Sequence, residues 1–251
     1  MQNRYKTSSS RWDICQFFRT LAYFGVIPLF SRVGWIQSLL GSEVNPVIQN
    51  VGYVQKGDIE KEQVQDDEMM IFDFSQSNNQ TDDALQSVWG PVDDVVMGGV
   101  SSSRLQAAAG SVVFTGTVST SNSGGFVSVR TRNFDPPFDL SAYQGIRLKV
   151  RGDGYRYKFL LRDAIQWDGI AYAYSFDTVM NEWITVDVPF DQMVPVFRAR
   201  TMNDAPGINS EQIRAFQFML SKFEYDGQLN PSFKPGSFEL YVESVSGYGG
   251  L

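Results

Sequence analysis

Short alternating segments fill the chain from Met69 onward, and they restrict its fold more than any other feature. In GIRLKVR, residues 145–151, three aliphatic side chains alternate with three basic ones. Because successive side chains of a strand point to opposite faces, this pattern predicts a strand with one face in a core and the other in water. The segments that we predict as strands are 69–74, 111–118, 125–132, 145–151, 155–163, 170–177, 183–188, 213–220 and 237–245.

Turn-forming residues separate these segments. GDG at 152–154 and NSGG at 122–125 are typical of connections between neighbouring strands. Only the segment 209–214 has the pattern of a short helix, begun by Asn209 or Ser210. About nine strands with no helices between them predict an all-β fold, an antiparallel β-sandwich or jelly roll.

The first 54 residues form a different, apolar region. Between residues 11 and 24, large apolar side chains recur at helical spacing, and Pro28 should end or kink this helix. The uncharged stretch 20–31 is shorter than the roughly 20 residues of a spanning helix, and a cleaved signal peptide also fits poorly. We predict a helical extension that contacts a membrane surface or a partner, or else packs on the chain's own domain. The expected contact residues are Phe17, Phe18, Leu21, Phe24 and Trp35.

A polar segment, QKGDIEKEQVQDDE at 55–68, follows the extension. Its six acids and two lysines favour a solvated tether. The chain is thus predicted to comprise an apolar helical extension over 1–54, an acidic linker over 55–68 and a β-sandwich domain over 69–251.

The sequence contains no histidine, and Cys15 is its only cysteine. These two facts exclude disulfides within the chain, zinc sites built from Cys and His, and mechanisms that need imidazole. A lone cysteine is typical of a reducing compartment. The net charge of −7 and the lack of a Lys/Arg-rich run argue against nucleic acid as a ligand. We expect neither a cofactor nor a bound metal.

The strongest local motif is WGPVDDVVMGGVS at 89–101. Asp93 and Asp94, followed by Gly98 and Gly99, could hold a cation or a polar ligand, because glycine lets the backbone approach closely. In the alternative, the carboxylates accept hydrogen bonds from nearby backbone N–H groups and the glycines adopt positive φ. Composition favours this second interpretation, a structural loop.

Two further groups of side chains suggest ligand sites. Paired carboxylates are the machinery of glycosidases, but nothing in the sequence sets any two at the required separation, so we do not expect catalysis. A cluster of Trp167, Tyr172 and Tyr174, with Gln166 and Asp168, could stack on a sugar or grip a partner. Alternatively, Tyr172 and Tyr174, which share a face of their strand, line the core. The acids considered for catalysis are Asp93, Asp94, Asp153, Asp163 and Asp168.

Several motifs occur in an order that resembles the complex I intermediate-associated protein 30 family, over roughly residues 70–248. The resemblance implies a galactose-binding-like jelly roll that acts as an assembly factor and not as a hydrolase. In mitochondria the family aids assembly of the membrane arm of respiratory complex I. The motifs are DDVVMGGVS (93–101), FTG (114–116), GGFVSVR (124–130), LSAYQGIRLKVRGDGYRYKF (140–159), WITVDVPFDQMVPVFR (183–198) and FQFMLSKFEYDG through GSFELYVESVSGY (216–248).

A similar domain occurs in oxygenic phototrophs, within atypical short-chain-dehydrogenase-like proteins linked to photosystem II biogenesis. The N-terminal region also resembles the start of those proteins, but their dinucleotide-binding part is absent here, so an NAD-linked role does not follow. The family supplies no catalytic residue. Its motif residues, which we interpret as determinants of the fold and as a partner-binding surface, are Asp94, Met97, Gly98, Gly99, Ser101, Gly124, Gly125, Phe126, Arg130, Gly152, Asp153 and Gly154.

The resemblance therefore implies a non-enzymatic assembly factor whose partners are subunits of a membrane complex, either photosystem II or an NADH dehydrogenase-type complex I. We expect it on the cytoplasmic or stromal side, peripheral to the thylakoid or plasma membrane. Trp167, Tyr172 and Trp183 are the expected anchors if they are exposed. The alternative function is a carbohydrate-binding module, which would carry exposed aromatic side chains beside paired polar groups.

Overall fold

The computed structural model describes residues 68–76 and 81–250. The predicted extension over 1–54, with its contact residues Phe17, Phe18, Leu21, Phe24 and Trp35, lies outside the described residues, as does all of the predicted linker except Glu68. In the part that is described, no helix is both long and apolar enough to span a membrane.

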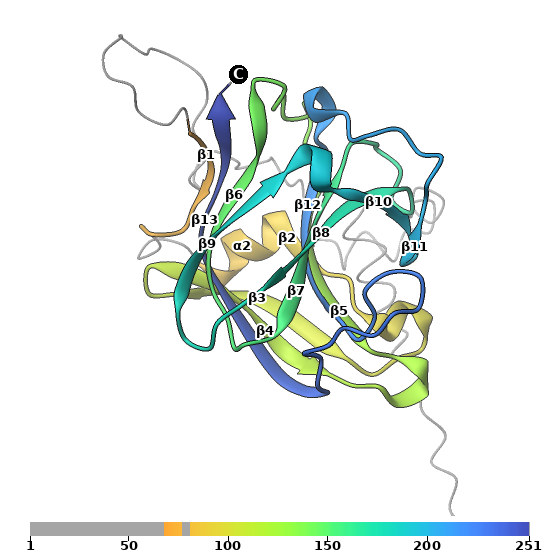
Figure 1. The fold of residues 1–251 in the computed structure, drawn as a ribbon. Coiled ribbons are helices and arrows are strands. Elements are labelled where there is room, and N and C mark those ends of the chain that lie inside the picture. The colour runs from red at the N-terminus through yellow and green to blue at the C-terminus, as the bar shows by residue number, and fades with distance from the viewer. Residues whose placement is uncertain (1–67, 77–80, 251) are drawn as a thin grey trace, which may run out of the picture.

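Two sheets make up the described part, and every pairing between their strands is antiparallel (Figure 1). Sheet A has the order β3-β4-β13-β6-β9, and β1 also pairs with β13. Because β13 is long, β4 pairs with its first half and β1 with its second half. The strands of sheet A are β1 (Met69–Asp73), β3 (Ser102–Ala108), β4 (Ser111–Val118), β6 (Tyr143–Arg151), β9 (Trp183–Pro189) and β13 (Gly236–Gly250).

Sheet B has the order β11-β10-β8-β7-β12-β5-β2. Neighbouring strands of this sheet can be far apart in the sequence: β5 pairs with β12 although about 90 residues separate them. The strands of sheet B are β2 (Trp89–Pro91), β5 (Phe126–Thr131), β7 (Arg156–Arg162), β8 (Ala171–Asp177), β10 (Val194–Phe197), β11 (Arg200–Thr201) and β12 (Ala215–Ser221).

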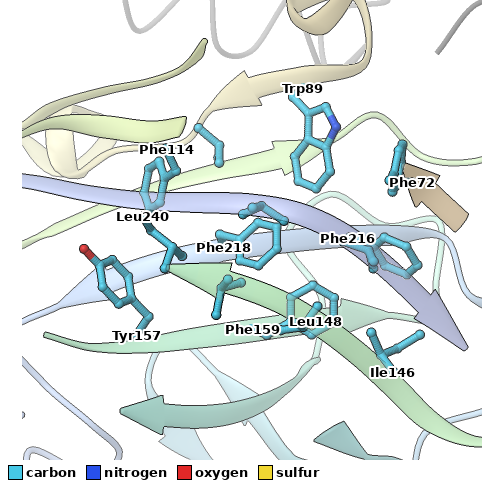
Figure 2. Packing of buried hydrophobic residues seen from close by; sticks show 14 of the residues in the cluster. Phe72, Trp89, Phe114, Ile146, Leu148, Tyr157, Phe159, Phe216, Phe218 and Leu240 are labelled. Carbon is cyan, nitrogen blue, oxygen red and sulfur yellow. The ribbon is translucent and has the colours of Figure 1, made fainter. Parts of the chain in front are cut away.

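One hydrophobic core joins the two sheets. Alternation builds it, as β6 illustrates: Ile146, Leu148 and Val150 are fully buried, while the basic residues between them point outward. Aromatic rings fill much of the space, and the Phe218 ring lies 5.8 Å from that of Trp89 and 5.1 Å from that of Phe159. Figure 2 shows members of the core from both sheets: Phe72, Trp89, Phe114, Ile146, Leu148, Tyr157, Phe159, Phe216, Phe218 and Leu240.

The all-β prediction is confirmed, and each of the nine predicted strands corresponds to a strand of the structure. Four strands were not predicted, namely β2, β3, β10 and β11. The segment of β3, SSRLQAA, consists mainly of residues with weak strand preference, and its pairing with β4 along its whole length overrides that preference.

The expectation that no helix interrupts the strands is wrong, because α2 (Asp82–Val88) lies between β1 and β2. Thr81 caps it by accepting a hydrogen bond from Ala84 N–H, and Leu85 is fully buried. Asp82 accepts a hydrogen bond from Ala107 N–H of β3 (2.9 Å), which ties the helix to sheet A. The short helix expected at 209–214 is a single 3₁₀ turn, η6 (Ser210–Gln212), capped by Asn209.

Candidate functional site

The Asp94 carboxylate organises the loop between β2 and β3. This side chain is buried at the start of the 3₁₀ turn η3 (Asp94–Met97). It accepts hydrogen bonds from Ser101 N–H (3.0 Å), from the Ser101 hydroxyl (2.6 Å) and from Gly125 N–H (2.7 Å). Two motifs that are distant in the sequence, 93–101 and 124–126, therefore meet at one carboxylate.

Glycines make room for this carboxylate. A Cβ atom on Gly99 would lie 2.2 Å from Asp94 Oδ1, and a Cβ on Gly124 would lie 2.4 Å from Oδ2. Gly98 and Gly125 have φ of 91° and 138°, which side chains rarely adopt. The glycines of both motifs are thus required by close approach or by backbone conformation around Asp94.

Asp93 connects the two sheets. Its carboxylate accepts hydrogen bonds from the N–H and hydroxyl of Ser103 in β3 (2.7 and 2.6 Å) and from Ser128 N–H in β5 (3.0 Å). Burial raises the pKa of Asp93 from 3.8 to about 6, with a smaller contribution from the neighbouring Asp94 charge, although the three hydrogen bonds oppose the shift. The two acids therefore join strands, as the structural-loop interpretation expects.

The same loop exposes two apolar side chains. Met97 is 73% exposed and Val100 is 54% exposed, whereas the polar side chains of Asp93, Asp94 and Ser101 in the same loop are buried. Because Asp94 accepts hydrogen bonds from Ser101 at the end of this loop and from Gly125 of the second motif, these side chains are held on a fixed backbone. No group of three or more His, Cys, Asp or Glu side chains that could hold a metal occurs among the described residues.

Buried cations hold two loops over the outer face of sheet B. Arg130 donates to the carbonyl of Trp167 (2.9 Å), and Lys158 donates to the carbonyls of Phe223 and Glu224. Burial lowers the pKa of Arg130 to about 9 and that of Lys158 to about 8. These charges are used within the fold, since backbone carbonyls of the covering loops accept their hydrogen bonds.

The predicted aromatic anchors differ in exposure. Tyr172 is buried in the core and Tyr174 packs against the core, so the core alternative describes both residues. Trp167 is half-buried and lies in the loop that Arg130 holds. Trp183, at the start of β9, is the exposed one of the three expected anchors.

The acids considered for catalysis are spread over the domain and engaged separately. Asp153 accepts hydrogen bonds from the Tyr157 hydroxyl (3.0 Å) and from Glu239 N–H (2.9 Å). Asp163 accepts from Asn209 N–H (3.0 Å), and Asp168 pairs with Arg198. Asp93 and Asp94 are neighbours in the sequence, and both hold backbone N–H groups.

Lys158 is a structural determinant that the sequence analysis did not single out. It occupies an outward position of β7, where an isolated charge is expected to reach water. The signal that could have identified it is weak, because only the loop after β12 decides whether that position is covered.

The comparison with protein families decides the affiliation of this chain. The family described as complex I intermediate-associated protein 30 (CIA30) matches residues 72–242, which include strands of both sheets and both motifs around Asp94. The chain belongs to the CIA30 family. This family is associated with the assembly of complex I.

This CIA30 chain has a relative in sequence and is similar to several solved structures. The Schizosaccharomyces pombe protein C9E9.15, described as uncharacterized, is 31% identical over 170 residues, which cover 61% of this chain and 74% of the yeast protein. Solved structures are similar at a lower level. A family 11 carbohydrate-binding module from Clostridium thermocellum, solved with a mixed-linked tetrasaccharide, has a TM-score of 0.49 at 18% identity and covers 73% of this chain and 96% of its own. The agarase AgWH50C has a TM-score of 0.46 at 11% identity over 74% of this chain and 25% of its own.

Within the CIA30 domain, most of the motif residues hold loops and strands together. Asp94, Ser101 and Gly125 are joined by hydrogen bonds, Gly99 and Gly124 leave space for the carboxylate, and Arg130 holds a loop. Met97 is the member of the motif that points into solvent. The partner-binding role that we assigned to the motif thus remains a prediction, and Met97 is the residue best placed for it.

Proposed function

We propose that this CIA30 protein is a non-catalytic factor that assists assembly of a membrane energy-converting complex, either an NADH dehydrogenase-type complex I or photosystem II. The observation that carries this proposal is the family match over residues 72–242. The proposed sandwich, of the galactose-binding-like type, supplies a rigid body, and the helical extension brings it to the membrane. The proposed location is peripheral, on the cytoplasmic or stromal side of the thylakoid or plasma membrane.

The loop around Asp94 supports a docking role. Assembly intermediates of membrane complexes expose apolar surface that would otherwise aggregate, and a transient binder protects it. Met97 and Val100 offer an apolar contact that is already ordered before binding, so docking costs less conformational entropy.

The experiment uses the tagged full chain in its own host, gentle solubilisation of membranes and identification of co-purifying proteins by mass spectrometry. We expect subunits of one membrane complex with the wild type, and their loss when residues 1–54 are deleted. The double variant Met97→Ser, Val100→Ser should recover about fivefold less of these subunits. A matched control, Ile165→Ser with Leu229→Ser, removes two exposed apolar side chains outside the loop and should recover the wild-type amount.

Two results would contradict the proposal. If the wild type stays in the soluble fraction without membrane subunits, the assembly role fails. If the isolated protein then binds a mixed-linked β-1,3-1,4 tetrasaccharide, carbohydrate binding replaces it. Equal losses with the loop variant and the control would show that exposed apolar side chains contribute without regard to position, and would reject the loop around Asp94 as the contact.

A further inference from the structure

The outer face of sheet A carries a ladder of basic residues on β6, and two of them are neutralised there. Arg147 forms two hydrogen bonds with the Asp187 carboxylate of β9 (2.7 and 3.0 Å). Lys149 pairs with Glu243 of β13 (3.4 Å). These pairs join neighbouring strands on the solvent side of the sheet.

Arg151, the third residue of the ladder, has aromatic rings where the others have acids. It is directly opposite Tyr241 of β13 and Trp183 of β9 in the strand register. Its guanidinium carbon lies 4.2 Å from the centre of the Tyr241 ring and 5.4 Å from that of Trp183. Arg151 forms no ion pair with any acid in residues 68–76 and 81–250, and its Nε is buried there without a hydrogen-bond partner.

The two acids of β13 on either side of Tyr241 have other partners. Glu243 pairs with Lys149, and Glu239, two residues before Tyr241, accepts a hydrogen bond from the Tyr241 hydroxyl (3.2 Å). The guanidinium is thus held by two rings, while its planar set of N–H donors has no carboxylate to bind within the described fold.

Exposed apolar side chains lie at the start of β9 and in the connection before it. The connection from β8 to β9 presents Val179 (47% exposed) and Met180 (67% exposed), and Trp183, at the start of β9, is 40% exposed. Met180 forms a β-bridge with Gly152, the residue after Arg151, so the backbone of this connection meets the chain just after β6.

The connection between β8 and β9 is itself fixed. Thr178 donates its hydroxyl to the carbonyl of Tyr155 (2.8 Å) and accepts from Gly154 N–H (3.1 Å). Asn181 N–H donates to the carbonyl of Gly152 (2.9 Å). A fixed backbone and a stacked arginine are both ordered before any partner arrives, which reduces the entropy cost of binding.

We infer that Arg151, Trp183 and Tyr241 form a docking surface for an acidic segment of a partner protein. A carboxylate of the partner binds the Arg151 guanidinium, and an apolar side chain next to it packs on Trp183. Trp, Tyr and Arg are the residue types that dominate the energetics of protein interfaces, and Arg binds a carboxylate through two parallel hydrogen bonds. This inference rests on the proposed assembly function and names the chemistry of the client.

Charge favours a protein over the other candidates. An anionic bilayer binds through several unpaired cations at once, whereas two of the three cations of this ladder are already paired. A neutral sugar would stack on Trp183 but would leave the guanidinium charge unpaired. A carboxylate beside an apolar side chain satisfies both parts of the surface.

The first test measures capture of membrane-complex subunits by the tagged full chain. Arg151→Gln and Trp183→Ser should each reduce the recovered subunits about tenfold. Arg147→Gln, which changes the same residue type on the same strand and face, should recover the wild-type amount. Thermal unfolding of each variant verifies that the fold is retained.

The second test identifies the carboxylate. Arg151→Lys places a primary amine on this surface, and a carbodiimide couples such an amine to a carboxylate that touches it, with loss of one water. We expect a crosslink from position 151 to an Asp or Glu of a captured subunit. A crosslink confined to Glu182 or Glu239 of the same chain would overturn the inference.

The remaining outcomes separate this inference from the proposed function. If the wild type captures no membrane-complex subunit, the assembly function fails and the inference with it. If Arg151→Gln captures as much as the wild type, the inference alone fails. If that variant captures subunits normally but no longer sediments with phosphatidylglycerol vesicles, the surface binds lipid and the inference is again wrong.

Discussion

Charged side chains occupy outward positions on both sheets, but the two sheets use them differently. On sheet B, Arg130 and Lys158 are buried beneath loops and donate to backbone carbonyls. On sheet A, Arg147 and Lys149 stay at the surface and pair with acids of neighbouring strands, while Arg151 stacks between rings. The same residue types therefore stabilise the fold on one sheet and remain at the surface on the other.

This difference indicates where to look for function in the domain. A charge that is enclosed by its own chain cannot meet a partner without unfolding part of the domain. Asp93 and Asp94 belong to this enclosed group, although they stand in the most recognisable motif. The exposed group, on the outer face of sheet A and at Met97, is the one available for contacts.

The largest effect should come from Asp94. Asp94→Ala leaves Ser101 and Gly125 with buried donors and no acceptor, so we expect a loss of about 4 kcal/mol in the free energy of unfolding. Asp187→Ala, which removes an acid from the outer face of sheet A, should cost less than about 1 kcal/mol. Urea denaturation measures both, and similar losses would remove the distinction between enclosed and exposed charges.

A smaller difference should separate the two arginines. Arg130→Ala removes a buried side chain and frees the loop that contains Trp167, so we expect a loss of about 3 kcal/mol. Arg147→Ala breaks a surface pair and should cost less than about 1 kcal/mol. Proteolysis at the loop 163–170 should accelerate in Arg130→Ala alone; cleavage at an unchanged rate would show that Arg130 does not hold this loop.

The enclosed acid Asp93 should make stability depend on pH. Between its ordinary pKa of 3.8 and its folded pKa of about 6, the folded chain keeps a proton that the unfolded chain releases. The contribution of Asp93 to the free energy of unfolding is therefore fully present below pH 3.8 and is lost as the pH rises through about 6. The advantage of the wild type over Asp93→Asn should shrink by about 2 kcal/mol between about pH 4.5 and about pH 7.5. Urea denaturation at a series of pH values measures it, and a constant difference would contradict burial of this carboxyl.

The smallest effect on stability should come from Arg151. Arg151→Gln removes two cation–π contacts at the surface, so the free energy of unfolding should fall by less than about 1 kcal/mol. A larger loss, measured by the same urea denaturation, would place Arg151 with the enclosed charges and would make it a poor candidate for docking.

Local patterns predicted much of this fold. Alternation in 145–151 identified β6 and its buried face, because the period of two is a property of the strand backbone. The same reasoning failed for β3, whose small and polar residues form a strand only because β4 pairs with it. It also failed for α2, a single short helix ordered by its Thr81 cap and its contact with β3.

The candidate site was predicted in part. The sequence singled out Asp93 and Asp94 and favoured a structural loop, which is the geometry observed. It also named Trp183 as an anchor on condition that it was exposed, but the neighbourhood of Arg151 could not be read from the sequence. Tyr241, Arg151 and Trp183 are far apart along the chain and adjacent only in the register of sheet A.

The sequence by itself determined the all-β class, the inward face of β6, the exclusion of imidazole and disulfide chemistry, and the motif order typical of the CIA30 family. Only the tertiary structure decided which outward charges are enclosed. Arg130 and Arg147 occupy equivalent outward positions of alternating strands, yet a loop covers the first and solvent reaches the second. The direction of a side chain is set by its own backbone, whereas its burial depends on segments that are distant in the sequence.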